Sequence, residues 1–433
     1  MLREETNRLL FFRPSRGSIL NEMIEAEERC RSGMLDESEA AAAVLSVMKE
    51  LIAFSLDKGI DGNLWENYLV SHMLTDENAY TLSRERKIPS EDSFSILAKD
   101  DFAIMRRLMD YDFEEFRKHV DDSLIEEILH FRNDARSSEH AGAAGEIISE
   151  VLSQLHDVKS DEAFKKVLDE QYFIRGTGEY AYNDAFRIAD DDNDHRLFKP
   201  IRAIDEVTFA DMVGYELQKG ALIRNTLAFI EGRPANNVLL YGDSGSGKST
   251  SIKALLNEYA HRGLRIIEVH KHQFKYISEI IGAIKNRNYR FILFIDDLSF
   301  EEFEIEYKYL KAVIEGDMEV KSDNILIYAT SNRRHLIRET WSDKNDMTHN
   351  EDIHRSDTVE EKTSLSSRFG VTIYFPSPDR AEYHEIVRSL AEEAGIDMDE
   401  QELLVKADAW EIRHGGVSCR TARQFVDYLA SAE

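Results

Sequence analysis

The eight residues "GDSGSGKS", from Gly242 to Ser249, have the types and spacing of a phosphate-binding loop. They fit the pattern G-x-x-x-x-G-K-[ST] and lie between an apolar segment that predicts a strand and an amphipathic segment that predicts a helix. Glycines are needed there because backbone amides must curl around a phosphate in conformations that a Cβ would obstruct. The pattern therefore predicts binding of a nucleoside triphosphate, against the alternative of a glycine-rich turn without chemistry.

The residues of this loop have separate expected roles. Lys248 can reach the β- and γ-phosphates, and the hydroxyl of Ser249 can bind Mg²⁺. The positive end of the following helix dipole adds to the attraction. The cofactors expected are therefore ATP and Mg²⁺. The loop residues predicted to bind nucleotide are Gly242, Asp243, Ser244, Gly245, Ser246, Gly247, Lys248, Ser249 and Thr250.

A second acidic element supports this interpretation. The segment "RFILFIDDL" is an apolar strand that ends in Asp296 and Asp297. We expect Asp296 to hold Mg²⁺ through its water shell and Asp297 to lie beside the attacking water. Two acids after a strand are common by themselves, but together with the phosphate loop they predict nucleotide hydrolysis.

The elements that must position these residues form an α/β pattern. After residue 200, short apolar segments alternate with helical ones, which predicts a parallel sheet wrapped by helices. The expected strands are residues 237–241, 265–270, 290–296, 325–330 and 371–375.

The chain before Tyr182 reads almost entirely as helices. In one of them Asp36 and Glu39 are spaced as a capping box, and Gly59 is the expected stop. The apolar face expected to pack into the core of this helix consists of Leu45, Met48, Ile52 and Leu56.

Breaks in these patterns predict the domain boundaries. The run "IADDDNDHRLFKP" interrupts the helical periodicity with acids and ends at a proline, as a linker would. The expected parts are a helical N-terminal domain (1–182), an acidic linker (183–200), an α/β nucleotide-binding domain (201–378) and a helical lid domain (379–433).

Composition limits the remaining classes of protein. The 433 residues include 42% hydrophobic residues and carry a formal net charge of −29, so a nucleic-acid partner would need a local basic patch. No apolar segment approaches the roughly 20 residues needed to span a bilayer. Cys30 and Cys419 lie far apart, which argues against a disulfide framework and a zinc site. We expect a cytoplasmic protein without a membrane partner.

From about Phe209 to its end the chain resembles an AAA+ ATPase module, and it is also similar to a bacterial group of such proteins known only as a domain of unknown function. The segment "FADMVGYELQKG" looks like the leading segment of the family, which implies that Val213 and Gly214 lie beside the adenine. The segment "LIYATSN" resembles the sensor strand, and this resemblance assigns Asn332 to orient water against the γ-phosphate.

The resemblance also assigns arginines. The segment "SLSSRFG" looks like the box that carries the arginine finger, which implies that role for Arg368. Arg333, Arg334 and Arg338 are alternatives for the same role. The segment "HGGVSCRTARQF" resembles the second sensor, with Arg420 as the expected contact and Arg423 as the alternative.

These assignments imply an Mg²⁺-dependent ATPase that remodels or loads a macromolecular partner. A finger donated by a neighbour implies a homo-oligomeric ring or spiral, and the family suggests a hexamer. Asp297 stands where the family usually has Glu, so turnover is expected to be slow. The alternative is a nucleotide-gated switch or scaffold that hydrolyses little.

The sequence leaves the partner open. After the second strand, His270, Lys271, His272 and Lys275 form a basic cluster that could touch a phosphate backbone, or simply be a solvated helix start. We expect an unknown protein partner in preference to nucleic acid. The N-terminal half is expected either to recruit that partner or to serve as a structural collar.

Overall fold

The computed structural model describes residues 1–32, 36–86, 91–133, 144–189, 197–300, 306–315, 322–332, 336 and 365–431. The chain forms two compact units, Met1–Asn183 with Pro200–Ala203, and Asp184–Lys199 with Ile204–Glu433. In the described part of the chain, every helix is too short or too polar to cross a membrane.

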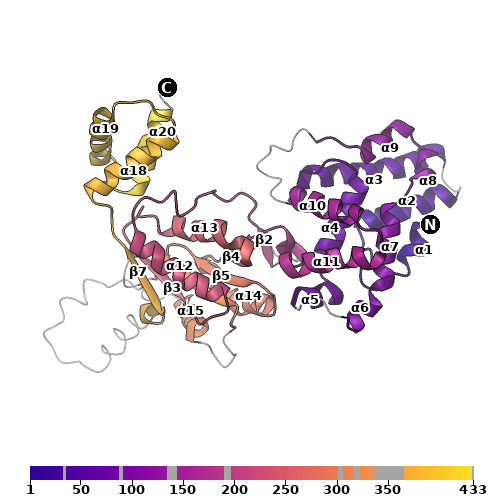
Figure 1. Cartoon of the computed structure of the whole chain (residues 1–433), viewed down its shortest axis with the longest axis horizontal. Coiled ribbons are helices and arrows are strands. Elements are labelled where there is room, and N and C mark those ends of the chain that lie inside the picture. Colours follow the sequence, from indigo (N-terminus) through magenta and orange to yellow (C-terminus); the bar gives the residue numbers. More distant parts are fainter. Residues whose placement is uncertain are drawn as a thin grey trace. The chain divides into compact units, whose positions relative to one another are not determined.

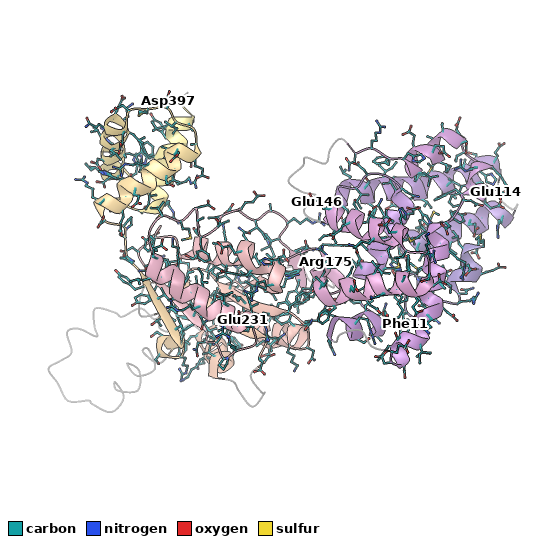
Figure 2. The ribbon with its side chains drawn as sticks, in the orientation of Figure 1. Phe11, Glu114, Glu146, Arg175, Glu231 and Asp397 are labelled. Atoms are coloured by element: carbon teal, nitrogen blue, oxygen red, sulfur yellow. The ribbon has the colours of Figure 1, made fainter. Side chains whose placement is uncertain are left out.

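The first unit is helical, as the sequence predicts, and charged side chains such as Glu114 and Glu146 lie on its outside (Figures 1 and 2). Its helices are α1 (Leu2–Thr6), α2 (Ile19–Ser32), α3 (Glu37–Lys58), α4 (Leu64–Thr75), α5 (Ala79–Arg86), α6 (Ser93–Leu97), α7 (Lys99–Met109), α8 (Glu114–Arg117), α9 (Asp122–Leu129), α10 (Ala144–Asp157), α11 (Asp161–Arg175) and the 3-10 helix η2 (Gly178–Ala181).

Both predicted ends of α3 are confirmed. The Asp36 carboxylate accepts the N–H of Glu39 at 2.8 Å, and the Glu39 carboxylate accepts the N–H of Asp36 at 3.2 Å. The helix ends at Gly59, whose φ of 68° is a left-handed conformation that suits glycine.

The predicted core face of α3 is wrong except for Met48. Leu45, Ile52 and Leu56 are exposed by 47%, 43% and 61%. The apolar residues of α3 extend over more than one stripe, and packing against α2 and α4 selects the neighbouring one. The buried apolar residues of this helix are Ala40, Val44, Val47, Met48 and Leu51.

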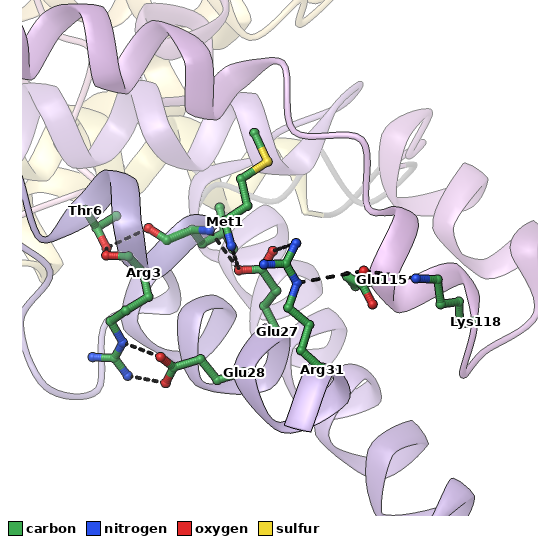
Figure 3. A network of polar contacts seen from close by, with 9 residues as sticks. Met1, Arg3, Thr6, Glu27, Glu28, Arg31, Glu115 and Lys118 are labelled. Atoms are coloured by element: carbon green, nitrogen blue, oxygen red, sulfur yellow. Dashed lines mark hydrogen bonds and ion pairs between the residues drawn. The ribbon is translucent and has the colours of Figure 1, made fainter. Parts of the chain in front are cut away.

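Ion pairs join the first helices of this unit. Glu27 on α2 is buried, and its carboxylate accepts the N–H of Leu2 at 2.8 Å. Arg31 lies between Glu27, at 3.7 Å, and Glu115 of α8, at 3.8 Å (Figure 3). These contacts hold the N-terminal residues against α2 without leaving the buried carboxylate unpaired.

A second buried carboxylate organises the loop after α1. Asp101 on α7 is only 1% exposed, and its carboxylate oxygens accept the backbone N–H groups of Leu10, Phe11 and Phe12 at 2.7 to 3.2 Å. These three backbone N–H groups of the loop between α1 and α2 are therefore satisfied by a side chain instead of by backbone carbonyl groups.

The second unit is built around a seven-stranded sheet in the order β2-β1-β4-β5-β6-β3-β7. The strand pairs β1–β4, β4–β5, β5–β6, β6–β3 and β3–β7 are all parallel, so their carboxyl ends meet at one edge. The five predicted strands are confirmed to within two residues at each end. The strands are β1 (Ala185–Ile188), β2 (Phe198–Pro200), β3 (Val238–Gly242), β4 (Leu264–Glu268), β5 (Arg290–Ile295), β6 (Ile325–Ser331) and β7 (Val371–Phe375).

Helices flank this sheet, and the last three form a separate bundle drawn in yellow in Figure 1. The bundle has its own apolar core, against which Val213 packs. The helical elements of this unit are α12 (Glu216–Ile230), α13 (Lys248–Tyr259), η3 (Ala260–Arg262), η4 (Lys271–Tyr276), α14 (Ile277–Ile284), α15 (Glu306–Glu315), α18 (Arg380–Glu393), α19 (Glu400–Arg413) and α20 (Cys419–Ala430).

The segment predicted as a linker contains two strands, so the prediction is wrong for those residues. In β1, Phe186 lies opposite Ile267 of β4 and is fully buried, and Ile188 is 3% exposed. The four residues "AFRI" are too short to give a periodic signal, and the acids on either side conceal them. Residues 190–196 of this segment lie outside the described residues.

Candidate nucleotide-binding site

The phosphate loop joins β3 to α13, as predicted, and its glycines have conformations that other residues rarely adopt. Gly242 has a φ of 146°, and a Cβ there would overlap the carbonyl oxygen of Phe375. Gly245 and Gly247 have φ values of 76° and 86°. The loop therefore curls at the carboxyl edge of the sheet because glycine occupies these three positions.

Lys248 is the first residue of α13 and is buried against the loop. Its ammonium donates hydrogen bonds to the carbonyl oxygens of Gly242 at 3.0 Å and Asp243 at 2.6 Å, and to Ser246 Oγ at 3.4 Å. Partial burial lowers the pKa of Lys248, against the opposing effect of nearby carboxylates, of which Asp243 acts most strongly. The ammonium is thus held inside the curl of the loop.

The acidic pair lies beside the loop because β5 ends there. Asp296 and Asp297 follow β5, and both side chains are exposed. Ser249 Oγ donates to Asp296 Oδ1 at 2.6 Å, so the structure brings the two predicted Mg²⁺ ligands together. Thr330 Oγ1 on β6 donates to the same oxygen at 2.5 Å and accepts the N–H of Asp297 at 2.9 Å.

Asp297 has a left-handed backbone conformation, with φ at 51°. Its Oδ1 accepts a hydrogen bond from Asn332 Nδ2 at 2.9 Å. Among residues other than glycine, Asp and Asn tolerate this conformation best because their short polar side chains bond locally. This backbone gives a physical reason for a short acid at this position.

Most of the predicted residues line one cavity of about 630 Å³. Its lining also includes the apolar side chains of Ile386 and Leu390 of α18. The predicted residues found in its lining are Val213, Ser244, Gly245, Ser246, Gly247, Lys248, Ser249, Thr250, Asp296, Asp297, Asn332 and Arg420.

Three predicted residues lie next to this cavity without lining it. Gly242 is buried at the end of β3, and Gly214 lies between the lining residues Val213 and Tyr215. The Asp243 carboxylate is turned toward the segment after β7, where its Oδ2 accepts the N–H and the hydroxyl of Ser377, both at 3.0 Å. Asp243 therefore joins the loop to the chain that leads into the helical bundle.

The predicted arginines fall into two groups. Arg368 precedes β7 and is outside the cavity lining. The alternatives for its role, Arg333, Arg334 and Arg338, lie outside the described residues. The second group, Arg420 and its alternative Arg423, lines the cavity.

Helix α20 begins directly against the phosphate loop. The N–H of Cys419 donates to the carbonyl oxygen of Gly245 at 3.1 Å, which places Arg420 beside the loop. Arg423 also lines the cavity, but its guanidinium lies 3.6 Å from the carboxylate of Glu393. The geometry therefore favours Arg420 over Arg423 as the contact to a phosphate.

Sequence reasoning missed several residues of the site, among them Thr330 and Tyr215. Thr330 contacts both acids through its hydroxyl, as described above, but a threonine within an apolar strand gives no signal in the sequence. Tyr215 lines the cavity, donates from its hydroxyl to the carbonyl oxygen of Pro376 at 2.7 Å and stacks on Phe375 at 5.3 Å between ring centroids. Only the position of Tyr215 after Val213 and Gly214 could have suggested it.

The basic cluster after β4 is partly structural. Phe274 is 1% exposed and belongs to the core. The Lys271 ammonium donates to the carbonyl oxygen of Ser299 at 2.8 Å and lies 5.1 Å from the ring centre of Phe300. Lys275 lies over the ring of its neighbour Tyr276. Lys271 thus serves contacts within its own unit.

Comparison with known families gives one match, the family described as "Protein of unknown function (DUF815)", over residues 181–433. The matched residues are more than half of the chain. The chain belongs to this family. No curated protein sequence matches this DUF815 protein.

Solved structures give distant matches to the DUF815 chain. RuvB of Thermotoga maritima, described as a Holliday junction branch migration motor, matches with a TM-score of 0.37 and 16% identity, covering 52% of this chain and 64% of the RuvB chain. A RuvB point mutant from the same organism matches with a TM-score of 0.37 and 18% identity over the same shares. Each of these two matches covers less than two thirds of the RuvB chain.

The fold assignment rests on the arrangement of the DUF815 chain itself. A parallel sheet carries the phosphate loop after β3 and the acidic pair after β5, and a small helical bundle follows the sheet. This is the AAA+ architecture that the sequence resemblance implies, preceded by an all-helical unit.

Proposed function

We propose that the DUF815 protein binds ATP and hydrolyses it with Mg²⁺, and that it uses this cycle to remodel or load a macromolecular partner. One observation carries the proposal: Ser249 Oγ and Asp296 Oδ1 lie 2.6 Å apart beside the curled phosphate loop, within a single cavity. A glycine-rich turn without a ligand would have no need of this convergence.

The residues present fit a nucleoside triphosphate. Three glycines with positive φ open the loop to a phosphate, and α13 directs its N-terminus and Lys248 toward the same place. The adenine is assigned to Val213 and Gly214, beside Ile386 and Leu390 of the bundle. An apolar wall with a few convergent polar groups is typical of nucleotide pockets.

The residues present also fit Mg²⁺, which prefers a few oxygen ligands and keeps several waters. Ser249 would bind it directly through Oγ, and Asp296 through water. When bound, the ion supplies charge neutralisation on the β- and γ-phosphates. Thr250 follows Ser249 in the cavity lining and is assigned to the phosphates.

Asp297 and Asn332 are assigned to the attacking water. The Asn332 amide holds Asp297 Oδ1, which fixes the orientation of the carboxylate. Asp297 Oδ2 then aligns the water and accepts its proton. Lys248 and Arg420 stabilise the negative charge that the transferring phosphoryl group carries.

Arg368 is assigned as the finger that a neighbouring copy donates. It lies outside the lining of the cavity in its own chain, and its side chain is half-buried. A site completed by a neighbour requires assembly, for which we propose a ring or spiral, hexameric by analogy with the family. The helical unit is then assigned to bind the partner.

A second candidate function is a nucleotide-gated switch with little turnover. The short carboxylate of Asp297, held by Asn332 in a left-handed turn, favours it, because its oxygens reach less far than those of Glu.

The test is phosphate release by the purified full-length protein, with Lys248→Ala as the blank. The ATPase proposal expects release well above the blank at concentrations that support assembly. Nucleotide uptake without release would favour the switch, and neither uptake nor release would remove both. The partner is tested by affinity capture with Asp297→Asn, which should retain a partner that hydrolysis normally releases.

A further inference from the structure

Thr330 is a buried residue of β6, 2% exposed, whose hydroxyl contacts both acids of the site. It donates to Asp296 Oδ1 at 2.5 Å and accepts the N–H of Asp297 at 2.9 Å. We propose that Thr330 is a positioning residue, which directs Asp296 toward Mg²⁺ and holds the backbone turn that aims Asp297 at water. This inference rests on the proposed function.

The first effect concerns the choice of oxygen on Asp296. A threonine hydroxyl has one proton, which here goes to Asp296 Oδ1. Ser249 donates to the same oxygen at 2.6 Å. Two protein hydroxyls thus converge on Oδ1, which leaves Oδ2 as the oxygen that can reach the water shell of Mg²⁺. Without Thr330 the carboxylate could rotate about its last bond.

The second effect concerns the backbone of Asp297. Its φ of 51° is an uncommon conformation that surrounding contacts must maintain. Thr330 holds it from the strand, because its hydroxyl accepts the N–H of Asp297 and its carbonyl oxygen accepts the N–H of Leu298 at 2.7 Å. Asn332, the first residue after the end of β6, holds the Asp297 carboxylate.

Threonine is not required here for packing. Valine has the same branched shape and suits a buried strand, so Thr330→Val removes both hydrogen bonds of the hydroxyl while keeping the volume. Thr330→Ser retains the hydroxyl and removes only a methyl group. A matched control is Thr226→Val. Thr226 on α12 is also buried, and its hydroxyl is hydrogen-bonded to Leu222 and Tyr328. It does not line the cavity.

The experiment measures ATP affinity by calorimetry with Mg²⁺ and with a chelator, together with phosphate release, on the full-length protein. For Thr330→Val we expect either the increase in ATP affinity that Mg²⁺ causes or the turnover number to fall about 10- to 100-fold. This is the usual effect of removing a group that orients a metal ligand. The affinity in chelator should stay within about twofold, because the phosphate loop is untouched. Thr330→Ser should recover most of the loss, and Thr226→Val should show none.

A Thr330→Val protein with the Mg²⁺ gain and turnover of the wild type would overturn the inference and leave the proposed function standing. A wild-type protein that takes up no nucleotide would overturn both. Equal losses of the Mg²⁺ effect or of turnover in Thr330→Val and Thr226→Val would show that Thr330 has only a structural role. That result would also overturn the inference. If Thr330→Val does not fold, Thr330→Ala removes the same hydroxyl with less bulk and has the same expected losses.

Discussion

The two units use aspartate in opposite ways. In the helical unit, Asp101 is 1% exposed and accepts three backbone N–H groups. In the α/β unit, Asp296 and Asp297 are exposed and meet side-chain donors from α13, from β6 and from the residue that follows β6. A carboxylate surrounded by backbone donors fixes a loop, whereas one that is exposed and steered by hydroxyl and amide groups is arranged for a ligand. The type of donor and the burial separate the two roles, and the residue type does not.

If this contrast holds, substitutions in one unit should change chemistry and substitutions in the other should change stability. Substitutions in both units and a change of pH test that separation.

The largest effect is expected for Arg368→Ala. Removal of an arginine finger should lower the turnover number about a thousandfold or more, with ATP affinity nearly unchanged, because the guanidinium acts on the transition state. Phosphate release and calorimetry measure both, with Arg388→Ala as the control, since Arg388 pairs with Glu400 on the bundle. Mixing Arg368→Ala with Lys248→Ala protein should restore activity if the finger comes from a neighbour. No recovery on mixing would place it within one chain.

Asp297→Asn should follow in size. Loss of the proton acceptor should lower turnover by about 10² to 10⁴-fold. Asparagine tolerates the left-handed backbone and can still accept the hydrogen bond from Asn332, so folding stability should stay within about 0.5 kcal/mol. Single-turnover phosphate release and urea unfolding check the two statements, with the exposed Asp205→Asn as the control. An unchanged rate would contradict the assigned role.

Asp101→Ala tests the other half of the comparison. Three N–H groups would lose their acceptor, so the free energy of unfolding of the helical unit should fall by about 3 kcal/mol. ATP affinity of the folded protein should stay the same, because Asp101 and the phosphate loop lie in different units. Urea unfolding followed by calorimetry measures both quantities. A weaker ATP affinity in folded protein would show that the units are coupled.

The smallest effect concerns pH and Lys248. Burial holds the pKa of Lys248 below the 10.5 usual for lysine, and bound phosphates would raise it again. As the pH rises through the lowered pKa, the free protein loses the proton that the complex keeps, so ATP affinity should fall by at most about tenfold per pH unit. Calorimetry in alkaline buffers of different ionisation enthalpy should show proton uptake on binding. Binding without proton uptake would mean that this pKa is not linked to the nucleotide.

The sequence was sufficient for the parts of the fold that local patterns determine. The strand that ends in Gly242 and the strand that precedes Asp296 are apolar runs bounded by turn residues, and the ends of α3 follow from Asp36 and Gly59. The sequence was insufficient where packing against neighbouring elements determines the structure. The face of α3 that contains Leu45 was expected in the core because the sequence does not show which helices flank α3. Strand β1 was missed because its pairing with β4 defines it.

The candidate site shows the same division. The phosphate loop and the acids could be predicted because glycines, a lysine and adjacent carboxylates form a recognisable pattern. Thr330 could not, since its role depends on the pairing of β5 with β6, which brings its hydroxyl to Asp296. The turn at Asp297 is likewise a property of the backbone, and the sequence showed only an unexpected Asp.

The close packing of Gly242 on Phe375 has a consequence for signal transmission. Gly242 packs so closely on the Phe375 carbonyl that a Cβ would not fit between them. The Asp243 carboxylate accepts a hydrogen bond from Ser377, two residues after Phe375. The start of the phosphate loop is therefore in direct contact with the segment that leads from β7 into the C-terminal helices. We expect a change in the contents of the loop to be passed to α18 through these contacts.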